Sequence, residues 1–349
     1  MARASRRRLQ FPAAGKAAVI TEEIPSPGPE EVRVRTRYSA VSPGTERLVY
    51  QGTVSSDLPA DASINALQGE DLSYPISYGY ACVGNVEEVG EDVGGEWQGT
   101  PVFAFQPHVS RFVASPNALI RLPDSVEPVD AVMIPSLETA VNLVMDGRPM
   151  IGERVLVFGQ GVVGLLTTRL LADHPLDTLV TVDPSAPRRR LSESMGALPV
   201  TSASEIEQVA GFKVASSSDA SSHTDAERAD LVYELTGHPT VLNDAVQWTG
   251  FDGRIVVGSW YGTKTAPINL GSHFHRSRMR IVSSQVSTVD PSLRGRWSKE
   301  RRMSVVLDLL NEVTPSQLIS DYFGIDEAPS VYEQLAADPS MLQPVFMYE

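Results

Sequence analysis

The spacing of hydrophobic and polar residues changes once along the chain, near Pro128. Before that position, apolar residues recur every second residue, as in Glu31–Tyr38, which reads EVRVRTRY, and in residues 101–122. Alternation of this kind, broken by proline and glycine, is typical of short β-strands. Beyond Pro128, apolar runs of the length of a strand alternate with segments whose apolar residues have the spacing of a helix. The pattern therefore predicts an all-β part, followed by an α/β part with a parallel sheet covered on both faces.

Residues 153–183 are the most informative stretch of the α/β part and predict a strand, a turn, a helix and a second strand. Gly159 allows the tight turn, Gly161 lets a pyrophosphate approach the backbone, and Gly164 lets the helix pack against the strand. The N–H groups that open the helix then receive the phosphates. The residues of this predicted dinucleotide loop are Gly159, Gln160, Gly161, Val162, Val163 and Gly164.

Asp183 ends the second strand, nineteen residues after Gly164. A carboxylate at this place accepts hydrogen bonds from both adenosine ribose hydroxyls and repels a 2′-phosphate. This favours NAD over NADP. The cations Arg188–Arg190 keep NADP open, because positive charge just beyond the strand can bind a 2′-phosphate.

The other elements of the α/β part follow from the same periodicities. A polar, Ser-rich surface stretch is expected over residues 201–228, and a polar surface insertion over residues 53–74 of the first part. Helices are predicted over residues 130–146, 188–196 and 239–248, and strands over residues 231–237 and 253–258.

Composition narrows the functional class. The length of 349 residues predicts two domains, and the net charge of −14 argues against nucleic acid as a partner. The acidic balance also suggests a salty cytoplasm, where solubility requires surplus carboxylates. No apolar run is long enough to span a membrane. The single cysteine, Cys82, excludes an intrachain disulfide framework and agrees with the cytoplasm.

The order of parts resembles the medium-chain dehydrogenase/reductase family. Supporting motifs are GTE at 44–46, YGYACVGNVEEVG at 78–90, VFAFQP at 102–107, the glycine loop, ELTG at 234–237 and GRIVVG at 253–258. The resemblance implies a GroES-like β-barrel catalytic domain over residues 1–128, a doubly wound Rossmann domain over 129–272 and a return to the barrel over 273–349. Within the family, SPGTERLVYQG and YPISYGYACVG are most similar to the bacteriochlorophyllide dehydrogenase branch, which oxidises a hydroxyethyl group to an acetyl group.

Departures from the family pattern predict an enzyme without zinc. Zinc members place a cysteine where this chain has Pro43, and His-Glu where it has Tyr80-Ala81; none of these three residues is a competent zinc ligand. Cys82 comes two residues late and has no partners at metal-ligand spacing. The segment that would carry a structural zinc is also missing after Pro107.

Without a metal, a hydrogen-bonding acid must polarise the substrate oxygen. Thr45 matches the family's hydroxyl relay position, and Tyr80 stands where a metal ligand would be. We therefore assign Tyr80 as proton donor or oxygen anchor, Thr45 as relay, and Glu46, which follows Thr45, as the orienting carboxylate. Each has a structural alternative: a turn hydroxyl for Thr45, a half-buried barrel aromatic for Tyr80, and a partner of Arg47 or another arginine for Glu46.

Further candidates come from the resemblance. Phe105 matches a substrate-pocket aromatic, with a core role as the alternative, and His108 is a candidate to carry the proton onward, with a surface histidine as the alternative. The cofactor candidates outside the glycine loop are Thr139 beside the nicotinamide, Arg188 over the adenine, Thr236 and Gly258. His273 and His275 would share a strand face, but they lack further ligands for a metal.

The leading hypothesis is therefore an NAD(P)-dependent, zinc-independent oxidoreductase acting on a secondary alcohol or its ketone. One alternative is a zinc-free quinone or enone double-bond reductase, and another is a dinucleotide-binding protein without catalysis. By analogy with the family, the protein is expected to be a homodimer that pairs through an edge strand over Trp260–Asn269.

Overall fold

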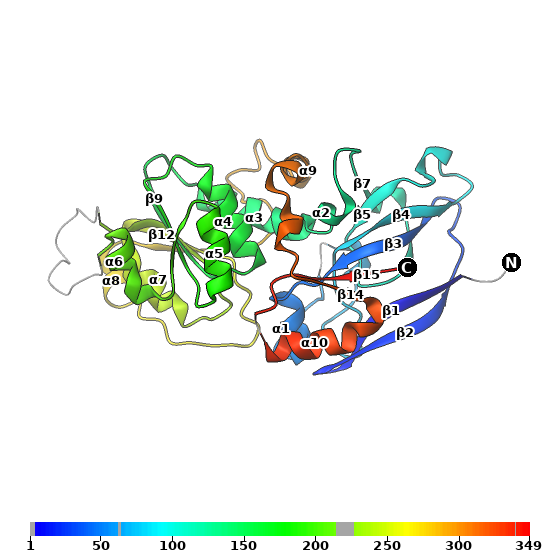
Figure 1. The fold of residues 1–349 in the computed structure, drawn as a ribbon, viewed down its shortest axis with the longest axis horizontal. Helices are drawn as coiled ribbons and strands as arrows, with labels where there is room; N and C mark the ends of the chain where they lie inside the picture. Colours follow the sequence, from blue (N-terminus) through cyan, green and yellow to red (C-terminus); the bar gives the residue numbers. More distant parts are fainter. Residues whose placement is uncertain (1–3, 62–63, 214–226, 339) are drawn as a thin grey trace. The chain divides into compact units, whose positions relative to one another are not determined.

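A computed structural model of the protein describes residues 4–61, 64–213, 227–338 and 340–349 (Figure 1). The chain folds into two compact units: unit 1 contains Met1–Pro135 and Leu307–Glu349, and unit 2 contains Ser136–Val306. The return to unit 1 comes later than the expected boundary after residue 272, because the strand β13 (Arg280–Ser283) still belongs to the sheet of unit 2. Part of the Ser-rich stretch expected over 201–228 lies outside the described residues.

Unit 1 is built on a seven-stranded sheet in the order β14-β15-β3-β4-β5-β7, and β6 also pairs with β3. Its pairs are antiparallel, except for β14 with β15. A separate hairpin, β1 with β2, precedes it. The strand bounds are β1 Ala4–Ala13, β2 Lys16–Ile24, β3 Val32–Ala40, β4 Cys82–Val89, β5 Pro101–Ala104, β6 Arg111–Ala114, β7 Ile120–Arg121, β14 Asp321–Gly324 and β15 Pro344–Met347.

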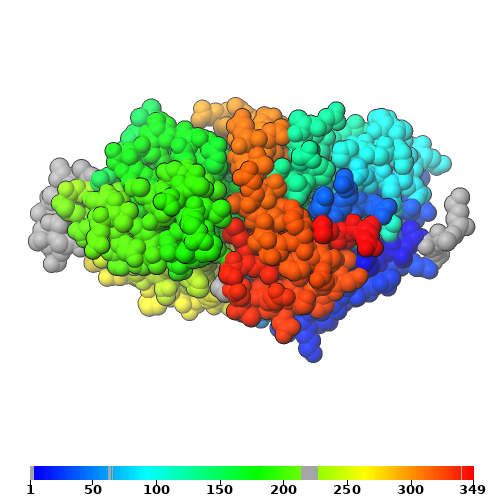
Figure 2. All heavy atoms as spheres, viewed as in Figure 1, coloured from blue at the N-terminus to red at the C-terminus, as the bar shows by residue number. Residues whose placement is uncertain are grey.

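Two apolar clusters form the core of unit 1. Alternation along β3 buries Val32 and Val34 in the first, together with Cys82. The second joins the hairpin to two helices, with the rings of Phe11 and Tyr332 packed edge to face at 4.9 Å. The C-terminal segment, orange to red, reaches the surface of unit 1 (Figure 2). The helices are α1 Thr45–Gln51, α2 Pro128–Ala131 and α10 Ala328–Ala337, with 3₁₀ turns η1 Asn65–Leu67, η2 Gly95–Trp97, η3 Pro116–Ala118, η5 Pro315–Leu318 and η6 Ile325–Glu327.

The helix expected over residues 130–146 is divided into two. Helix α2 ends at Ala131, and α3 begins at Ile134. Pro135 explains the restart, because a proline has no N–H to donate and fits only the first turn of a helix. The boundary between the units falls at this proline.

Unit 2 is a six-stranded parallel sheet in the order β10-β9-β8-β11-β12-β13. Alternate residues of β8 face opposite cores: Val155 and Val157 pack with Leu171 of α4, and Leu156 and Phe158 pack with helices α6 and α7. Helices therefore cover both faces, as the sequence predicts. The bounds are β8 Arg154–Phe158, β9 Thr178–Val182, β10 Leu198–Val200, β11 Ala229–Glu234, β12 Thr249–Val257, α3 Ile134–Gly147, α4 Val162–Ala172, α5 Ala186–Ser194, η4 Ala203–Glu205, α6 Ile206–Ala210, α7 Val241–Trp248, α8 His273–Arg276 and α9 Lys299–Val313, whose last residues belong to unit 1.

Two local expectations are wrong. Residues 260–269 form no strand, and β13 is the edge strand instead. Gly262, at φ 62°, and Pro267 interrupt the expected run. His273 and His275 lie on the short helix α8, not on a strand. Within the part of the chain that the structure describes, no helix has the length and apolar character that crossing a membrane requires.

Candidate active site

The predicted cofactor residues of unit 2 lie together at the carboxyl ends of its strands. Phe158 of β8 pairs with Val182 of β9 and with Glu234 of β11, which in turn pairs with Val257 of β12. The strands therefore end side by side, at the point where the strand order reverses. In sheets of this kind, dinucleotides bind outside the carboxyl ends of the strands at that point. Gly159, Asp183 and Gly258 directly follow strands β8, β9 and β12, and Thr236 lies two residues after the end of β11.

The three glycines of the loop have different structural roles. Gly159 has φ +92°, and a Cβ there would lie 2.6 Å from the carbonyl oxygen of Leu235. At Gly164 a Cβ would lie 2.0 Å from the carbonyl oxygen of Gly159, so the helix can approach the strand only without a side chain. A Cβ on Gly161 would meet nothing within 4 Å. The protein itself thus requires the first and last glycines, whereas the middle one leaves space for a ligand.

Side chains within the loop hold its shape. Gln160 is fully buried; its Nε2 donates to the carbonyl oxygen of Gly159 over 3.0 Å, and its Oε1 accepts from Thr168 Oγ1 over 3.0 Å. Val162 and Val163 open helix α4, the first buried and the second half-buried. What Val162 and Val163 offer a phosphate is therefore their backbone N–H groups, which have no partner inside the helix.

Asp183 is held firmly and is 4% exposed. Its Oδ2 accepts from the backbone N–H of Gln160 and its Oδ1 from that of Ser185, both over 2.8 Å. A carboxylate has about four acceptor positions, so further hydrogen bonds are available for ribose hydroxyls. A guanidinium nitrogen of Arg188 lies 4.0 Å from Oδ2. The carboxylate and the cation that were expected to compete over cofactor choice are therefore neighbours.

The remaining cofactor candidates lie on unit 2 as well. Thr236 donates from its backbone N–H and its hydroxyl to the buried carboxylate of Glu234, which fixes the turn after β11. A Cβ on Gly258 would lie 2.6 Å from the side chain of Leu235 and 2.7 Å from that of Leu143, so these side chains would have to shift to admit it. Thr139 lies half-buried on α3.

In unit 1, Thr45 and Tyr80 come together as expected from the resemblance. Thr45 is the first residue of α1, and Tyr80 stands just before β4. The side chains of Ser42 and Thr45 lie beside the Tyr80 phenol, whose ring is half-buried. Burial, and next the negative charge of Glu46, raise the pKa of Tyr80 to about 12. The phenol is thus protonated at neutral pH and can donate to an oxygen.

Glu46 is fully buried, and its carboxylate hydrogen-bonds to Ser42, His108 and Tyr332 and, among the described residues, not to an arginine. Its Oε1 accepts from the backbone N–H of Ser42 over 2.7 Å, and its Oε2 lies 2.9 Å from Nε2 of His108. The hydroxyl of Tyr332, on α10, donates to the same Oε2. Burial, and then the charge of Glu46, raise the pKa of Tyr332 well above its usual value.

His108 is completely buried, so the interpretation as a surface histidine is wrong. Its Nδ1 lies 2.6 Å from Oγ of Ser39, and that Oγ lies 2.8 Å from the hydroxyl of Tyr348. Gly79, at φ +114°, makes room for the ring, because a Cβ there would lie 2.7 Å from His108 Cδ2. Phe105 follows β5 and is half-buried, with its ring edge to face with that of Phe103 at 4.9 Å.

Sequence reasoning missed three members of this buried cluster, Ser39, Tyr332 and Tyr348. Tyr332 is 286 positions from Glu46, and Tyr348 is 309 positions from Ser39. No local spacing connects residues so far apart. The only available signal was His108 itself, placed directly after a predicted barrel strand.

Known proteins are similar to this chain in sequence and in fold. Residues 162–304 match the family model described as zinc-binding dehydrogenase. The chain is 22% identical to D-guloside 3-dehydrogenase of Escherichia coli K12 over 91% of this chain and 92% of that protein, and 25% identical to (R,R)-butanediol dehydrogenase of Bacillus subtilis over 68% and 72%. Among solved structures, 2R,3R-butanediol dehydrogenase of B. subtilis superposes with a TM-score of 0.76 at 18% identity over 99% and 100% of the two chains. An alcohol dehydrogenase, RspB, of E. coli CFT073 in complex with NADH gives 0.75 at 18% over 99% of each.

The fold and these relatives define an NAD(P)-dependent oxidoreductase with a two-domain α/β structure. These similarities support a member of the medium-chain dehydrogenase/reductase family that is alcohol dehydrogenase-like.

The donor set of this chain does not fit the zinc that the family description implies. Among the described residues, no three His, Cys, Asp or Glu side chains come together as a metal site would require. The thiol of Cys82 is buried and donates to the carbonyl oxygens of Gln106 and Pro107. Burial raises the pKa of this thiol.

Proposed function

We propose that this protein transfers hydride between NAD and a secondary alcohol or its ketone without using zinc. The observation that carries the proposal is the protonated Tyr80 phenol, which lies beside Thr45 and stands where zinc relatives have a metal ligand. Because a hydrogen-bond donor can polarise a carbonyl oxygen, Tyr80 would replace the metal in that role. Thr45 would orient the phenol and relay the proton.

In the direction of reduction, a hydride from the nicotinamide adds to the carbonyl carbon and the Tyr80 phenol gives its proton to the oxygen. In the direction of oxidation, the alcohol proton moves to the Tyr80 oxygen while the phenol passes its own proton to the Thr45 oxygen, and the Thr45 hydroxyl proton goes on to water. The negative charge of Glu46, which contributes to the raised pKa of Tyr80, keeps the phenol in its donating form. Phe105 would line the apolar side of the substrate pocket.

NAD is the proposed cofactor because Asp183 places a buried carboxylate at the end of β9. The glycine loop, Thr139, Thr236 and Gly258 would complete its site, with Arg188 over the adenine. The homodimer, the cytoplasmic location and the resemblance to the bacteriochlorophyllide branch stay predictions. If the sheet edge mediates dimerisation, β13 is the strand that would do so.

The proposal is tested by Tyr80→Phe, which removes the phenol oxygen and keeps the ring. We expect the turnover of secondary alcohols with NAD to fall by about 10²–10⁴-fold, the usual contribution of a general acid or base. Tyr78→Phe is the matched control, because Tyr78 is a buried neighbour whose ring meets that of Tyr80 at 6.2 Å. Unchanged turnover in Tyr80→Phe would remove this residue from the mechanism.

The same assay separates the alternative functions. A substrate screen in which quinones or enones are reduced, while alcohols and ketones are not converted, would replace the proposal by double-bond reduction. NADH binding without conversion in any substrate class would indicate a binding protein. Metal analysis of the active sample tests zinc independence, and stoichiometric zinc would contradict it.

A further inference from the structure

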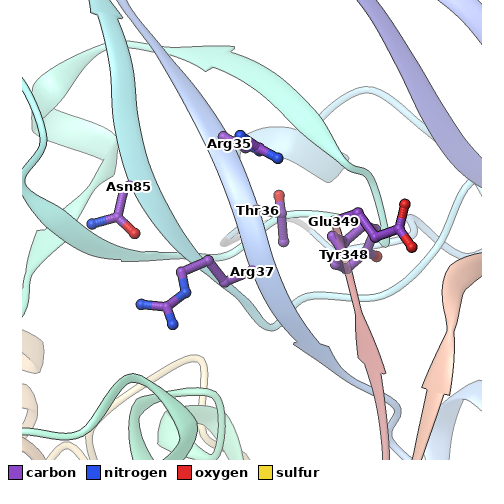
Figure 3. A pocket seen from close by; sticks show the side chains of 6 residues that line it. All are labelled: Arg35, Thr36, Arg37, Asn85, Tyr348 and Glu349. Carbon is purple, nitrogen blue, oxygen red and sulfur yellow. The ribbon is translucent and has the colours of Figure 1, made fainter.

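Unit 1 has a surface pocket of about 330 Å³ whose charged side chains are Arg35, Arg37 and Glu349 (Figure 3). Both signs of charge are present, so the pocket favours neither an anion nor a cation, and none of the predicted site residues lines it. Unit 2, in contrast, has a buried polar group directly at the predicted cofactor site. This group is the carboxylate of Glu234, the last residue of β11.

The Glu234 carboxylate is 0% exposed and accepts hydrogen bonds from two different turns. Its Oε1 accepts from the hydroxyl of Thr236 and, over 2.8 Å, from the backbone N–H of the same residue, which belongs to the turn after β11. Its Oε2 accepts from the hydroxyl of Tyr261, over 2.5 Å, in the turn after β12. A hydroxyl that donates to a carboxylate over this distance makes a strong hydrogen bond. The carboxylate therefore joins the two turns.

Further hydrogen bonds connect the same turns. Ser259 Oγ accepts from the backbone N–H of Gly237 over 2.9 Å, and Lys264 Nζ donates to the carbonyl oxygen of Gly237 over 2.9 Å. The ring of Tyr261 packs against the apolar core to which α7 contributes. Burial, and next the hydrogen bond to Glu234, raise the pKa of Tyr261 well above its usual value, so the phenol stays a donor. We call the side chains of Glu234, Ser259, Tyr261 and Lys264 the turn clasp.

The order of the strands determines which half of a dinucleotide would meet these turns. In the proposed cofactor site, Asp183 binds the adenosine ribose beyond β9, and the start of α4, after β8, binds the pyrophosphate. The next strands along the sheet are β11 and β12. Because a dinucleotide binds across the carboxyl ends of the strands on both sides of the switch point, its second half lies over β11 and β12. The turn clasp is therefore at the place of the nicotinamide riboside.

We propose that Glu234 and Tyr261 are positioning residues for the nicotinamide half of NAD. The inference rests on the proposed function, which supplies the cofactor and its orientation. Neither side chain has to touch the cofactor. Their hydrogen bond holds the turn after β12 against the turn after β11, so the backbone that receives the nicotinamide riboside is in place before binding. Binding then requires no ordering of the two turns, which would otherwise weaken the affinity.

The test compares two ligands, NADH and ADP-ribose, which share the adenosine and the pyrophosphate, whereas ADP-ribose has no nicotinamide. In Tyr261→Phe the ring is kept, and both hydrogen bonds from Thr236 to Glu234 remain, but the bond between the turns is lost. Isothermal titration calorimetry should show a Kd for NADH that rises by about tenfold, as expected when about a tenth of the molecules have the turns correctly placed. The Kd for ADP-ribose should stay at the wild-type value.

A second variant tests the same connection at another bond. Ser259→Ala removes the acceptor of the Gly237 N–H and leaves the pair of Glu234 and Tyr261 intact. We expect the same selective loss of NADH affinity.

Tyr233→Phe is the matched control. Tyr233 directly precedes Glu234 on β11 and is 0% exposed, and its hydroxyl has no hydrogen-bond partner among the described residues. Losing this hydroxyl should change neither Kd.

The two ligands separate positioning from general stability. Equal weakening of NADH and ADP-ribose in Tyr261→Phe would show that the turn clasp only stabilises the fold, and unchanged NADH affinity would show that the turns keep their place without it; either result would overturn the proposal. A wild type that binds neither ligand would overturn the proposed cofactor site and this inference with it. A selective loss of NADH affinity in a protein that oxidises no alcohol would support the positioning role and contradict only the proposed reaction.

Discussion

At the scale of single residues, Asp183 has two roles that a substitution can separate. Its Oδ2 supports the backbone of the cofactor loop at Gln160, its Oδ1 accepts from Ser185, and its charge faces Arg188 at 4.0 Å. Asp183→Asn keeps the shape but removes the charge and one acceptor. We expect kcat/KM with NAD to fall by about 10- to 100-fold, since a hydrogen bond to a charged group contributes about 1.5–3 kcal/mol, and we expect the NADP to NAD ratio to rise.

Steady-state kinetics with both cofactors checks this expectation. Asp177→Asn is the control, because Asp177 directly precedes β9 and is largely exposed. An unchanged preference in Asp183→Asn would mean that the charge of Asp183 does not select the cofactor.

At the scale of elements, two glycines of the unit β8-α4-β9 have different roles. Gly164 is needed for folding, and Gly161 is expected to matter for cofactor binding. Gly164→Ala would place a Cβ 2.0 Å from the carbonyl oxygen of Gly159, so we expect a lower Tm. Overpacking of this kind typically costs about 1–3 kcal/mol. Gly161→Ala meets no atom of the protein within 4 Å, so its Tm should stay the same while NADH binding, followed by fluorescence, weakens. Equal NADH affinity in Gly161→Ala and the wild type would place the pyrophosphate elsewhere.

The same elements show what the sequence can predict. The sequence predicts β8, α4 and β9, because their signals (the apolar periodicity, the glycine spacing and the acid at the end of β9) all lie within one short stretch. The two strands pair in parallel, as a strand–helix–strand unit predicts. The pairing of Thr45 with Tyr80 followed from the family resemblance, with both residues in recognisable motifs. The partners of Glu46 did not follow, because Tyr332 belongs to a helix near the other end of the chain. The polar residues of a buried cluster show no periodicity, and only the folded sheet brings Ser39, His108 and Tyr348 together.

At the scale of the whole molecule, the excess of carboxylates predicts a response to salt. The 43 acidic residues outnumber the 29 basic ones, which gives the net charge of −14. The native state concentrates this charge, and repulsion between exposed groups falls as the Debye length shrinks from about 10 Å at 0.1 M salt to about 3 Å at 1 M. We therefore expect the Tm to rise between about 0.1 and 1 M potassium chloride, by roughly 2 °C or more for each kcal/mol of repulsion that is screened.

Differential scanning calorimetry in potassium chloride measures this directly, and the choice of salt matters. Sulfate would also raise the Tm by strengthening apolar burial, whereas a series of isotonic sucrose solutions raises it without screening any charge. An increase in Tm with potassium chloride that sucrose does not reproduce at equal osmolality would show that the salt acts by screening the repulsion between carboxylates. A Tm that stays constant or falls with chloride would mean that attraction within ion pairs, such as Arg254 with Glu153 at 2.7 Å, outweighs the repulsion of the unpaired acids. The acidic composition would then have no stabilising link to a salty cytoplasm.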